Sequence, residues 1–366
     1  MQVLAAVAHA PGADFSLETV ELDAPRADEI RVRIMAVGVC HTDLAARDGA
    51  LRVSLPAVLG HEGAGVVDAV GSAVSSVKPG DRVAITFRSC GVCKRCGSGD
   101  PAYCHSMPAL NFTGMRPDGS KALRQGATAV SSNFFGQSSF ATYALAYERN
   151  VLKLPDDFPF HLAAPLGCGV QTGVGGVMLA LAAEAGSSIL ILGGGAVGLS
   201  AVMGAAIQGC GQIIVVEPFP ARRDLAIELG ATHAIDPAAT ADLPAAVRAI
   251  APPGVDYAFD TTGRPEIQAA TMNCLGPKGV LGIVGLPKPG APMPGNLAAV
   301  LAYGQTVRGI IEGDSEPEVF VPQLIDYWRA GRLPLEKLVA TFPFAEINAA
   351  VKAQHRGDCV KVVLTV

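Results

Sequence analysis

At 366 residues the chain is too long for one ordinary hydrophobic core, so two domains are expected. Half of the residues are hydrophobic and 17% are charged, as in ordinary globular proteins. The formal net charge is −5, and the sequence contains no block of like charges. This composition argues against a nucleic-acid partner and against docking on an anionic membrane surface.

The first part of the chain, to about residue 169, is predicted to be rich in β-strands. Residues 3–8 are apolar, but no positively charged region precedes them, so they indicate a strand rather than a signal peptide. Glu29 to Val37 alternates charged and apolar side chains, which is typical of a strand with one wet face. Arg82 to Ile85 predicts another strand, after a turn. Glycines between Gly60 and Gly71 predict short strands and tight turns.

The pattern changes near residue 169 to strands that alternate with helices. Buried strands are predicted at residues 187–192 and 212–216, and further strands at 233–236, 255–260 and 279–284. Helices are predicted from the end of the glycine-rich stretch 193–198 to about residue 208, and at 222–229, 243–251 and 265–275. Such alternation indicates a doubly wound parallel sheet, which makes the fold class α/β. A helix at 321–330 and a strand at 360–366 follow, and we expect this tail to rejoin the first domain.

Seven side chains with metal-binding chemistry form two groups in the sequence. Four thiols follow the spacing C-x2-C-x2-C-x7-C and predict a closed structural zinc site: Cys90, Cys93, Cys96 and Cys104. An iron–sulfur centre or plain buried cysteines are the alternatives. Cys40, His61 and Cys168 offer three further ligands, which would leave a fourth position of a zinc ion for water or substrate. Their wide separation in sequence proves little alone, because a lone cysteine or histidine is usually a core residue.

A glycine-rich loop follows the first buried strand of the second half. Gly193, Gly195 and Gly198, with Ala196 and Val197 between them, open a helix, and Glu217 ends the next strand. This context is typical of a dinucleotide-binding loop, in which the pyrophosphate lies on free N–H groups at the start of the helix. The Glu217 carboxylate would accept hydrogen bonds from the adenosine ribose and repel a 2′-phosphate, so NAD is favoured over NADP. The nearby Arg222 could weaken that preference, or simply lie on a solvated helix face.

The chain resembles the zinc-dependent medium-chain alcohol dehydrogenases along essentially its whole length. Four signatures carry the resemblance: GHEGAG (60–65), CGVCKRCGSGDPAYC (90–104), GCGVQTG (167–173) and LGGGAVG (192–198). Segments 110–120 and 134–150 are similar to the aryl-alcohol, or benzyl-alcohol, branch. The resemblance implies a GroES-like zinc-binding catalytic domain over residues 1–169, a Rossmann NAD-binding domain over 170–311, and a return to the catalytic domain over 312–366.

The resemblance also implies a reaction and its residues. A primary, aromatic alcohol and its aldehyde would be interconverted by hydride transfer to NAD, with two Zn²⁺ ions per subunit. Cys40, His61 and Cys168 would hold the catalytic zinc. Thr42 would hydrogen-bond the substrate oxygen, or merely cap a helix. Asp43 would orient the His61 ring.

Four further positions receive roles from the same resemblance. Glu62 would either approach the zinc transiently or contact its ligands without binding the metal. His41 and Lys361 would contact the cofactor pyrophosphate. A surface charge is the alternative for Lys361. Thr172 would lie near the nicotinamide. One departure concerns Ala45, where many relatives have a histidine that receives the proton from the cofactor ribose, so the relay must end in water or in another base.

Several alternatives stay open at this stage. A dehydrogenase for S-hydroxymethylglutathione would need cationic side chains in its substrate cleft, and residues 107–119 do not obviously supply them. A broad aliphatic alcohol dehydrogenase and a non-catalytic NAD-binding protein are the others. Phe87, Phe112 and Met115 are candidates for an aromatic pocket or for the core. We also expect a homo-oligomer, a tetramer rather than a dimer. No stretch approaches the roughly 18 apolar residues of a membrane helix, and nine cysteines without a leader indicate the reducing cytoplasm.

Overall fold

The computed structural model describes residues 1–366 and divides them into two compact units. Unit 1 comprises residues 1–168, 316–326 and 335–366, and unit 2 comprises residues 169–315 and 327–334. The chain therefore returns to its first unit after completing the second.

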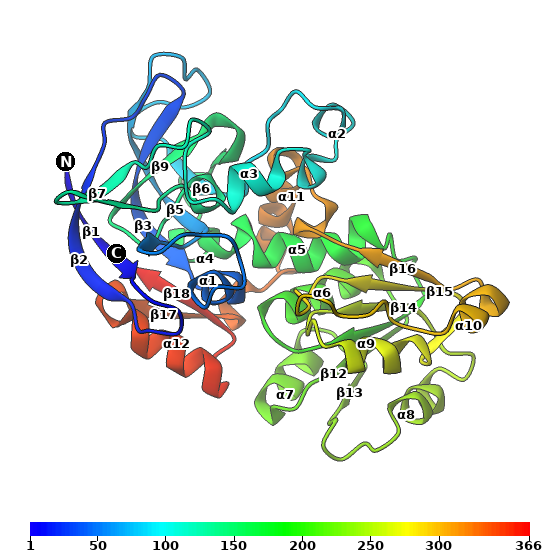
Figure 1. The fold of residues 1–366 in the computed structure, drawn as a ribbon. Helices are drawn as coiled ribbons and strands as arrows, with labels where there is room; N and C mark the ends of the chain where they lie inside the picture. The colour runs from blue at the N-terminus through cyan, green and yellow to red at the C-terminus, as the bar shows by residue number, and fades with distance from the viewer. The chain divides into compact units, whose positions relative to one another are not determined.

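Unit 1 contains two sheets of mainly antiparallel strands (Figure 1). The five-stranded sheet has the order β4-β1-β2-β7-β8, with bounds Ala57–Val58, Gln2–Ala8, Ser16–Leu22, Leu123–Gln125 and Thr128–Val130. The seven-stranded sheet has the order β10-β6-β5-β3-β18-β17, with bounds Val151–Lys153, Arg82–Ile85, Glu62–Val70, Glu29–Gly38, Lys361–Thr365 and Val339–Pro343. Strand β9 (Tyr143–Tyr147) also pairs with β3. Strand β3 is thus the centre of this sheet, and the metal-site residues lie near its end.

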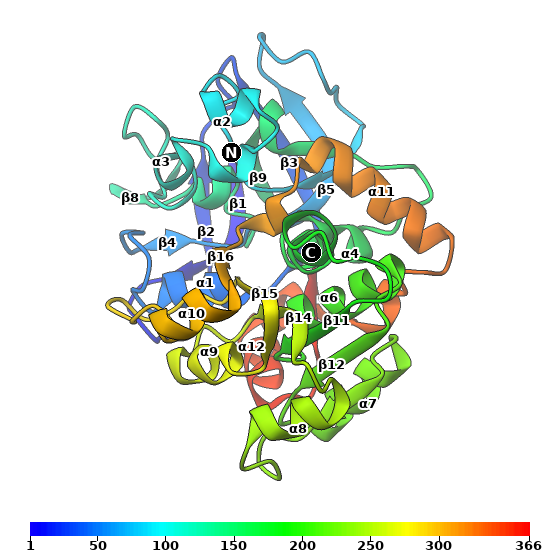
Figure 2. The same ribbon diagram turned by 90° about the vertical axis from the view of Figure 1, so that its right-hand side faces the viewer.

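Short helices join the strands of unit 1. They are α1 (His41–Arg47), α2 (Lys94–Gly97), α3 (Met107–Asn111), α4 (Phe160–Ala163), the first part of α11 (Pro317–Arg329) and α12 (Ile347–Arg356). Figure 1 shows the loop that carries α2 projecting from the strands of this unit, and in Figure 2 the same loop lies in front of them. Aliphatic and aromatic side chains from both sheets form one buried cluster, which includes Ile30, Ile34, Ile85, Phe134 and Phe140.

Unit 2 is a six-stranded parallel sheet with the order β13-β12-β11-β14-β15-β16. The strands span His233–Ile235, Gln212–Val216, Ser188–Leu192, Val255–Asp260, Leu275–Ile283 and Thr306–Gly309. The helices are α5 (Gly169–Gly175), α6 (Ala196–Gln208), α7 (Pro220–Glu228), α8 (Leu243–Ile250), α9 (Pro265–Met272) and α10 (Leu297–Tyr303). Figure 1 shows the strands between α5 on one side and α8 and α9 on the other.

The alternation of side chains explains why this sheet needs helices on both faces. Leu190 and Leu192 of β11 pack with Val247 of α8 and Met272 of α9, whereas the intervening Ile191 lies toward Gly198 of α6. All five residues of β11 are buried, as expected for a central parallel strand. The predicted α/β class and the doubly wound parallel sheet are confirmed.

Two predictions about local structure need correction. The glycine-rich stretch 60–71 is mostly one nine-residue strand, β5, rather than a series of short strands and turns. Glycine is needed there for close packing, because a Cβ at Gly65 would lie 2.0 Å from the Arg33 carbonyl oxygen on the neighbouring strand. Strand β15 begins at Leu275, four residues earlier than expected, and replaces the predicted end of the preceding helix.

By length and hydropathy, none of the helices taken singly qualifies as a membrane span. Two consecutive bent segments, Phe160–Gly167 and Gly169–Ala180, reach the threshold only when they are counted together.

Candidate functional site

Three sequence-distant side chains meet at the end of strand β3. Cys40 follows β3 and precedes α1, His61 immediately precedes β5, and Cys168 follows a short 3-10 turn (Ala164–Gly167). Their ligand atoms, together with a carboxylate oxygen of Glu62, all lie within 4.8 Å of one another. The three predicted ligands of the open zinc site are therefore brought together, and Glu62 stands beside them.

Asp43 fixes two of these three segments. One carboxylate oxygen lies 2.7 Å from Nδ1 of His61 and accepts the backbone N–H of Gly60 at 3.0 Å. The other accepts the backbone N–H of Cys40 at 3.0 Å, which also caps the start of α1. With Nδ1–H donated to Asp43, the lone pair of Nε2 is free to face Cys168, whose sulfur is 3.3 Å away. This is the orientation that a metal-binding histidine needs.

The charges around the cluster shift the pKa values of its thiol and imidazole groups in opposite directions. The pKa of Cys40 lies well below the usual thiol value because its sulfur interacts with Cys168 and, despite burial, with His61. Burial by itself would lower the pKa of His61, but the adjacent Asp43 carboxylate raises it well above the usual value. Thiolate and imidazole donors of this kind are the ones that Zn²⁺ prefers. Two cysteines and one histidine within reach of a common point fit a zinc ion.

Behind the cluster lies a buried ion pair between Glu62 and Lys361. The two charged atoms are 2.5 Å apart, and the Lys361 ammonium also donates to the Val39 carbonyl at 3.1 Å. Burial raises the pKa of Glu62 to about 7, although Lys361 opposes the shift. Gly38 makes room for this pair, since a Cβ there would collide with the Glu62 carboxylate. Lys361 is only 3% exposed, so the alternative of a surface charge is wrong.

Aromatic rings enclose the imidazole of His61. The Phe135 ring stacks on it with centroids 4.3 Å apart and planes 23° apart, and Phe134 meets it edge-on at 5.7 Å. Phe112 in turn packs edge-on against Phe135 at 5.3 Å. Phe135 has φ 52°, a left-handed conformation that costs a side-chain-bearing residue about 1–2 kcal/mol. Of the three residues predicted for an aromatic pocket, Phe112 belongs to this wall, Phe87 is buried, and Met115 is half-buried.

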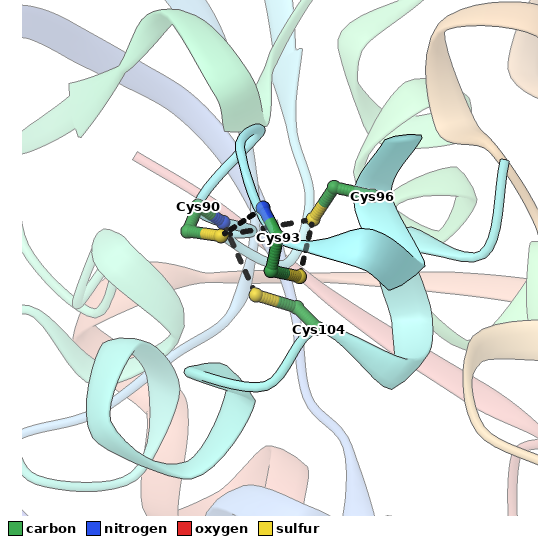
Figure 3. Close-up of side chains that lie close together, drawn as sticks. All are labelled: Cys90, Cys93, Cys96 and Cys104. Carbon is green, nitrogen blue, oxygen red and sulfur yellow. Dashed lines mark hydrogen bonds between the residues drawn. The ribbon is translucent and has the colours of Figure 1, made fainter. Parts of the chain in front are cut away.

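The four remaining predicted ligands form a second cluster, on the loop that carries α2. Figure 3 shows the sulfurs of Cys90, Cys93, Cys96 and Cys104 turned toward one another. The Cys93 and Cys96 sulfurs are 3.5 Å apart, and those of Cys90 and Cys96 are 3.9 Å apart. Thiolates that share a tetrahedral zinc at about 2.3 Å lie about 3.8 Å from one another. The cluster therefore has the size of a Cys₄ zinc site.

Backbone N–H groups support these sulfurs. The N–H of Cys93 donates to the Cys90 sulfur at 3.3 Å, and the N–H of Ser106 donates to the Cys104 sulfur at 3.4 Å. Hydrogen bonds from the backbone near Cys96 and His105 lower the pKa of Cys93 to about 6. A thiol with that pKa is mostly thiolate at neutral pH, which is the form that binds metal.

In unit 2 the glycine loop has the geometry expected of a dinucleotide site. Gly193 has φ 97°, and a Cβ at Gly198 would lie 1.8 Å from the Gly193 carbonyl oxygen, so both positions require glycine for the fold itself. Gly195 differs, because a Cβ there would meet nothing within 4 Å. Protein packing does not account for that glycine, whereas the close approach of a pyrophosphate to Gly195 and to the N–H groups of Ala196 and Val197 would.

Glu217 is buried at the end of β12 and is bound to the same loop. Its carboxylate accepts the N–H of Gly194 at 2.6 Å and that of Phe219 at 2.9 Å. The Arg222 guanidinium stacks on the Phe219 ring, with 4.9 Å from its carbon to the centroid. Arg223 forms an ion pair with Asp236 at 3.0 Å. Arg223 also donates to the backbone carbonyl of Glu217 at 2.8 Å.

The other predicted residues are distributed between the two units. In unit 1, His41 is exposed and Thr42 half-buried at the start of α1, with the Thr42 hydroxyl 3.7 Å from the Cys40 sulfur. In unit 2, Thr172 is buried in α5, and its hydroxyl lies 3.4 Å from the carboxylate of Glu312.

Sequence reasoning missed the residues that surround His61. Phe135 and Gln137 were assigned no role, although Gln137 donates to the His61 carbonyl at 2.8 Å and accepts the Gly63 N–H at 3.0 Å. The only local pattern that could have pointed to these residues is the pair Phe134-Phe135 before Gly136. It reads as ordinary core packing, because neither helical nor strand periodicity predicts a left-handed phenylalanine.

Comparisons with known proteins agree with this geometry. Residues 26–156 match the family described as alcohol dehydrogenase GroES-like domain, and residues 196–326 match the zinc-binding dehydrogenase family. The chain is 47% identical to geraniol dehydrogenase of Castellaniella defragrans over 361 residues, which cover 98% of this chain and 96% of that protein.

Two solved structures are similar over the full chain. The alcohol dehydrogenase zinc-binding domain protein of Burkholderia ambifaria is 48% identical, with a TM-score of 0.97, and the alignment covers 100% of this chain and 99% of the other. Benzyl alcohol dehydrogenase of Acinetobacter calcoaceticus is 40% identical, with a TM-score of 0.96 and the same coverage.

Proposed function

The chain belongs to the zinc-dependent medium-chain alcohol dehydrogenases, and we propose that it interconverts a primary aromatic alcohol of the benzyl type and its aldehyde, with NAD as hydride acceptor. The observation that carries this proposal is the meeting of Cys40, His61 and Cys168 around a common point, with Asp43 holding the imidazole. A non-catalytic NAD-binding protein would have no need of these three donors in one place.

In this proposal each side chain has a defined task. Cys40, His61 and Cys168 hold the catalytic Zn²⁺, and the Cys90–Cys104 cluster holds the structural Zn²⁺. When bound, the catalytic ion acts as a Lewis acid that acidifies the substrate hydroxyl and, in reverse, polarises the aldehyde carbonyl.

The remaining residues of the site act on the substrate, a proton or the cofactor. The Thr42 hydroxyl would hydrogen-bond the substrate oxygen, accept its proton and pass its own hydroxyl proton on to water or another base, and Asp43 keeps the His61 ring in place. Lys361 balances the Glu62 charge beside two thiolates, which keeps a third anion from accumulating there. Lys361 and His41 are also the candidates for contact with the pyrophosphate. Thr172 would adjoin the nicotinamide.

Replacing Glu217 by alanine should weaken the preference for NAD. Hydrogen bonds to a charged group contribute about 1.5–3 kcal/mol, so kcat/KM with NAD should fall by roughly 10- to 100-fold. The repulsion of a 2′-phosphate disappears at the same time, so kcat/KM with NADP should rise. Asp224→Ala, which removes an exposed carboxylate of the neighbouring helix α7, serves as the control. An unchanged NAD/NADP ratio in Glu217→Ala would remove Glu217 from cofactor selection.

The aromatic substrate class is supported by the rings beside His61. Phe112, Phe134 and Phe135 make the surroundings of His61 apolar, which suits a hydrophobic rather than a small aliphatic alcohol. The similarity to benzyl alcohol dehydrogenase points the same way. Geraniol, a long unsaturated primary alcohol, is the second candidate, because the relative at 47% identity is a geraniol dehydrogenase.

A panel of alcohols tests the substrate class. Initial rates with benzyl alcohol, cinnamyl alcohol, geraniol, ethanol and a secondary alcohol, each with NAD and with NADP, should give the highest kcat/KM for benzyl alcohol with NAD. Higher kcat/KM for geraniol would favour the second candidate, and faster turnover of ethanol than of either would contradict both. A glutathione adduct is the remaining rival, and segment 107–119 contains a single cationic residue, Arg116, which is buried in ion pairs.

We also propose a homo-oligomer, a tetramer rather than a dimer, that works in the cytoplasm. Unit 2 supports association, because β16 is the edge strand of its sheet and the adjacent helix α10 exposes Leu297 and Leu301 to 87% and 86%. Sedimentation velocity at micromolar concentration distinguishes the possible assemblies.

A further inference from the structure

We propose that Phe135 positions the His61 imidazole for its metal, and that a hydrogen bond between Tyr147 and Asn133 holds Phe135 in place. This inference rests on the proposed function in one respect only, namely that His61 is a zinc ligand. It concerns side chains that touch neither the metal nor the reacting atoms.

Segment 133–138 contacts His61 on several sides. The Phe135 ring lies parallel to the imidazole at 4.3 Å, and the Phe134 ring stands against it edge-on. The Gln137 side-chain amide bonds to the backbone directly after the ligand, at the carbonyl of His61 and the N–H of Gly63. Asp43 fixes one ring nitrogen, but a single hydrogen bond leaves the ring free to tilt about it. Stacking against Phe135 restricts that tilt.

The backbone of the segment adopts a conformation that it would not take unaided. Asn133, Phe135, Gly136 and Ser138 all have positive φ, at 81°, 52°, 66° and 60°. Three of these four residues carry a side chain, for which left-handed conformations are unfavourable. Such a segment keeps its shape only when surrounding contacts impose it.

Residues 147–150 supply those contacts at the start and in the middle of the segment. The Tyr147 hydroxyl lies 3.0 Å from the side-chain carbonyl of Asn133, while the Asn150 amide donates to the carbonyls of Phe135 and Gly136, each at 3.2 Å. The Asn133 amide nitrogen donates in turn to the Met115 carbonyl at 2.9 Å. All these side chains are buried or nearly so, so water does not compete for the bonds.

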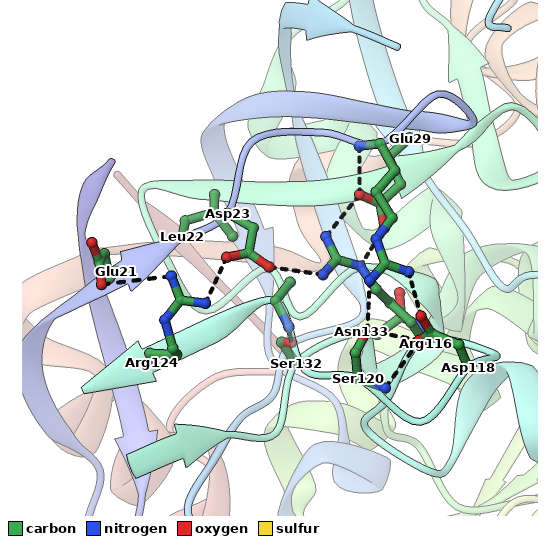
Figure 4. Close-up of polar contacts among 12 residues, drawn as sticks. Glu21, Leu22, Asp23, Glu29, Arg116, Asp118, Ser120, Arg124, Ser132 and Asn133 are labelled. Atoms are coloured by element: carbon green, nitrogen blue, oxygen red, sulfur yellow. Dashed lines mark hydrogen bonds and ion pairs between the residues drawn. The ribbon is translucent and has the colours of Figure 1, made fainter. Parts of the chain in front are cut away.

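A buried ion-pair network fixes Tyr147 itself. Its hydroxyl is also 3.2 Å from Glu29, so its single proton is shared between the Asn133 side-chain carbonyl, the nearer acceptor at 3.0 Å, and this carboxylate. The two carboxylate oxygens of Glu29 accept from Arg116 at 2.7 and 2.9 Å. Figure 4 shows Arg116 between Glu29 and Asp23, with Arg124 continuing the chain of charges toward Glu21 at the surface. A bidentate guanidinium–carboxylate pair has one preferred geometry. Arg116 therefore fixes the position of the Glu29 carboxylate beside the Tyr147 hydroxyl. A continuous path of contacts therefore runs from Arg116 to His61.

The test measures how fast a chelator removes each zinc from the holoenzyme. A colorimetric chelator should give two phases, and the phase missing in Cys168→Ser identifies the catalytic ion. Phe135→Leu removes the stacked ring, and Tyr147→Phe removes one oxygen atom while keeping the ring volume. Phe158→Leu, a fully buried phenylalanine of the same unit, and Tyr143→Phe on the same strand β9 are the matched controls.

We expect Phe135→Leu to release the catalytic zinc about tenfold faster, as loss of support around a metal ligand commonly does. Tyr147→Phe should also speed release of the catalytic zinc, by about fivefold, because the loss of one buried hydrogen bond changes an equilibrium or rate by about that factor. The structural phase should be unchanged in both. With Co²⁺ in the catalytic site, the visible d–d bands should shift in these two variants and not in the controls. This spectroscopic change distinguishes positioning from a general loss of stability.

Identical release phases and identical cobalt spectra in Tyr147→Phe and wild type would overturn the inference, whatever the behaviour of Phe135→Leu. If Phe135→Leu does not fold, Tyr147→Phe still decides, because it leaves the core volume intact. A wild-type protein with no metal at Cys40, His61 and Cys168 would instead overturn the proposed function itself. The two failures are therefore distinguishable.

Discussion

Replacing Cys168 by serine is expected to lower kcat/KM for alcohol oxidation by about 10³-fold or more. A metal Lewis acid supplies several kcal/mol of transition-state stabilisation, and each 1.36 kcal/mol is a factor of ten in rate. Serine is a poor ligand at neutral pH because its hydroxyl stays protonated. The Cys168 sulfur also lies 3.3 Å from Nε2 of His61, so its removal opens the cluster at its centre.

Metal analysis gives the same experiment a second readout. The wild-type subunit should contain two zinc ions and Cys168→Ser only one, since the Cys90–Cys104 cluster shares no ligand with the first site. Cys210→Ser is the control, because that thiol is buried in unit 2 outside both clusters. Full activity in Cys168→Ser, or one zinc in the wild-type subunit, would contradict the assignment of Cys168 as a ligand.

The fold of unit 2 was predictable because its residues carry local signals. Ser188–Leu192 is a short apolar run that ends at Gly193, and the glycine spacing that follows marks the start of a helix. Each strand and helix of this unit was predicted from a short stretch of neighbouring residues. The edge strand Thr306–Gly309 was missed for the corresponding reason, since only one of its four residues, Val307, is a large aliphatic.

The metal cluster at Cys40 shows where local reasoning ends. Cys40, His61 and Cys168 are separated by 21 and 107 positions, and only the pairing of β3 with β5 and the return of the chain at residue 168 bring them together. No periodicity encodes that meeting, so the resemblance to a family supplied it. The four-cysteine loop is the opposite case, because its ligands lie within 15 residues and their spacing alone predicted a common metal.

The largest gap between sequence and structure concerns support for the ligands. Asp43 was expected to orient His61, and it does contact Nδ1. Lys361 was expected to meet the cofactor pyrophosphate, which stays a prediction, and its buried pairing with Glu62 was not predicted. Phe135 received no role at all. Stacking and buried ion pairs depend on side-chain positions that a one-dimensional pattern does not contain, and the left-handed φ of Phe135 runs against the propensity of its residue type.

The structural cluster leads to the second large effect. Cys93→Ala should remove zinc from the loop and unfold residues 90–104 while the sheets of unit 1 persist. Residues 90–100 of the loop have little else to hold them, because α2 has four residues, none of them buried, and Val92 is 91% exposed, whereas Pro101, Ala102 and Cys104 are buried. Structural zinc sites contribute about 10–16 kcal/mol of apparent binding energy in small peptides, so its loss leaves this loop without its main stabilisation.

Limited proteolysis with trypsin measures this local unfolding directly. Lys94 and Arg95 lie within the cluster, and cleavage after them requires the loop to open. If even about 3 kcal/mol of local stability is lost, the open population and the cleavage rate should rise by about 100-fold. Chelation of wild-type protein should reproduce the effect, and added zinc should reverse it in wild type but not in Cys93→Ala. Equal cleavage rates in variant and wild type would mean that side-chain packing, and not a metal, holds the four thiols together.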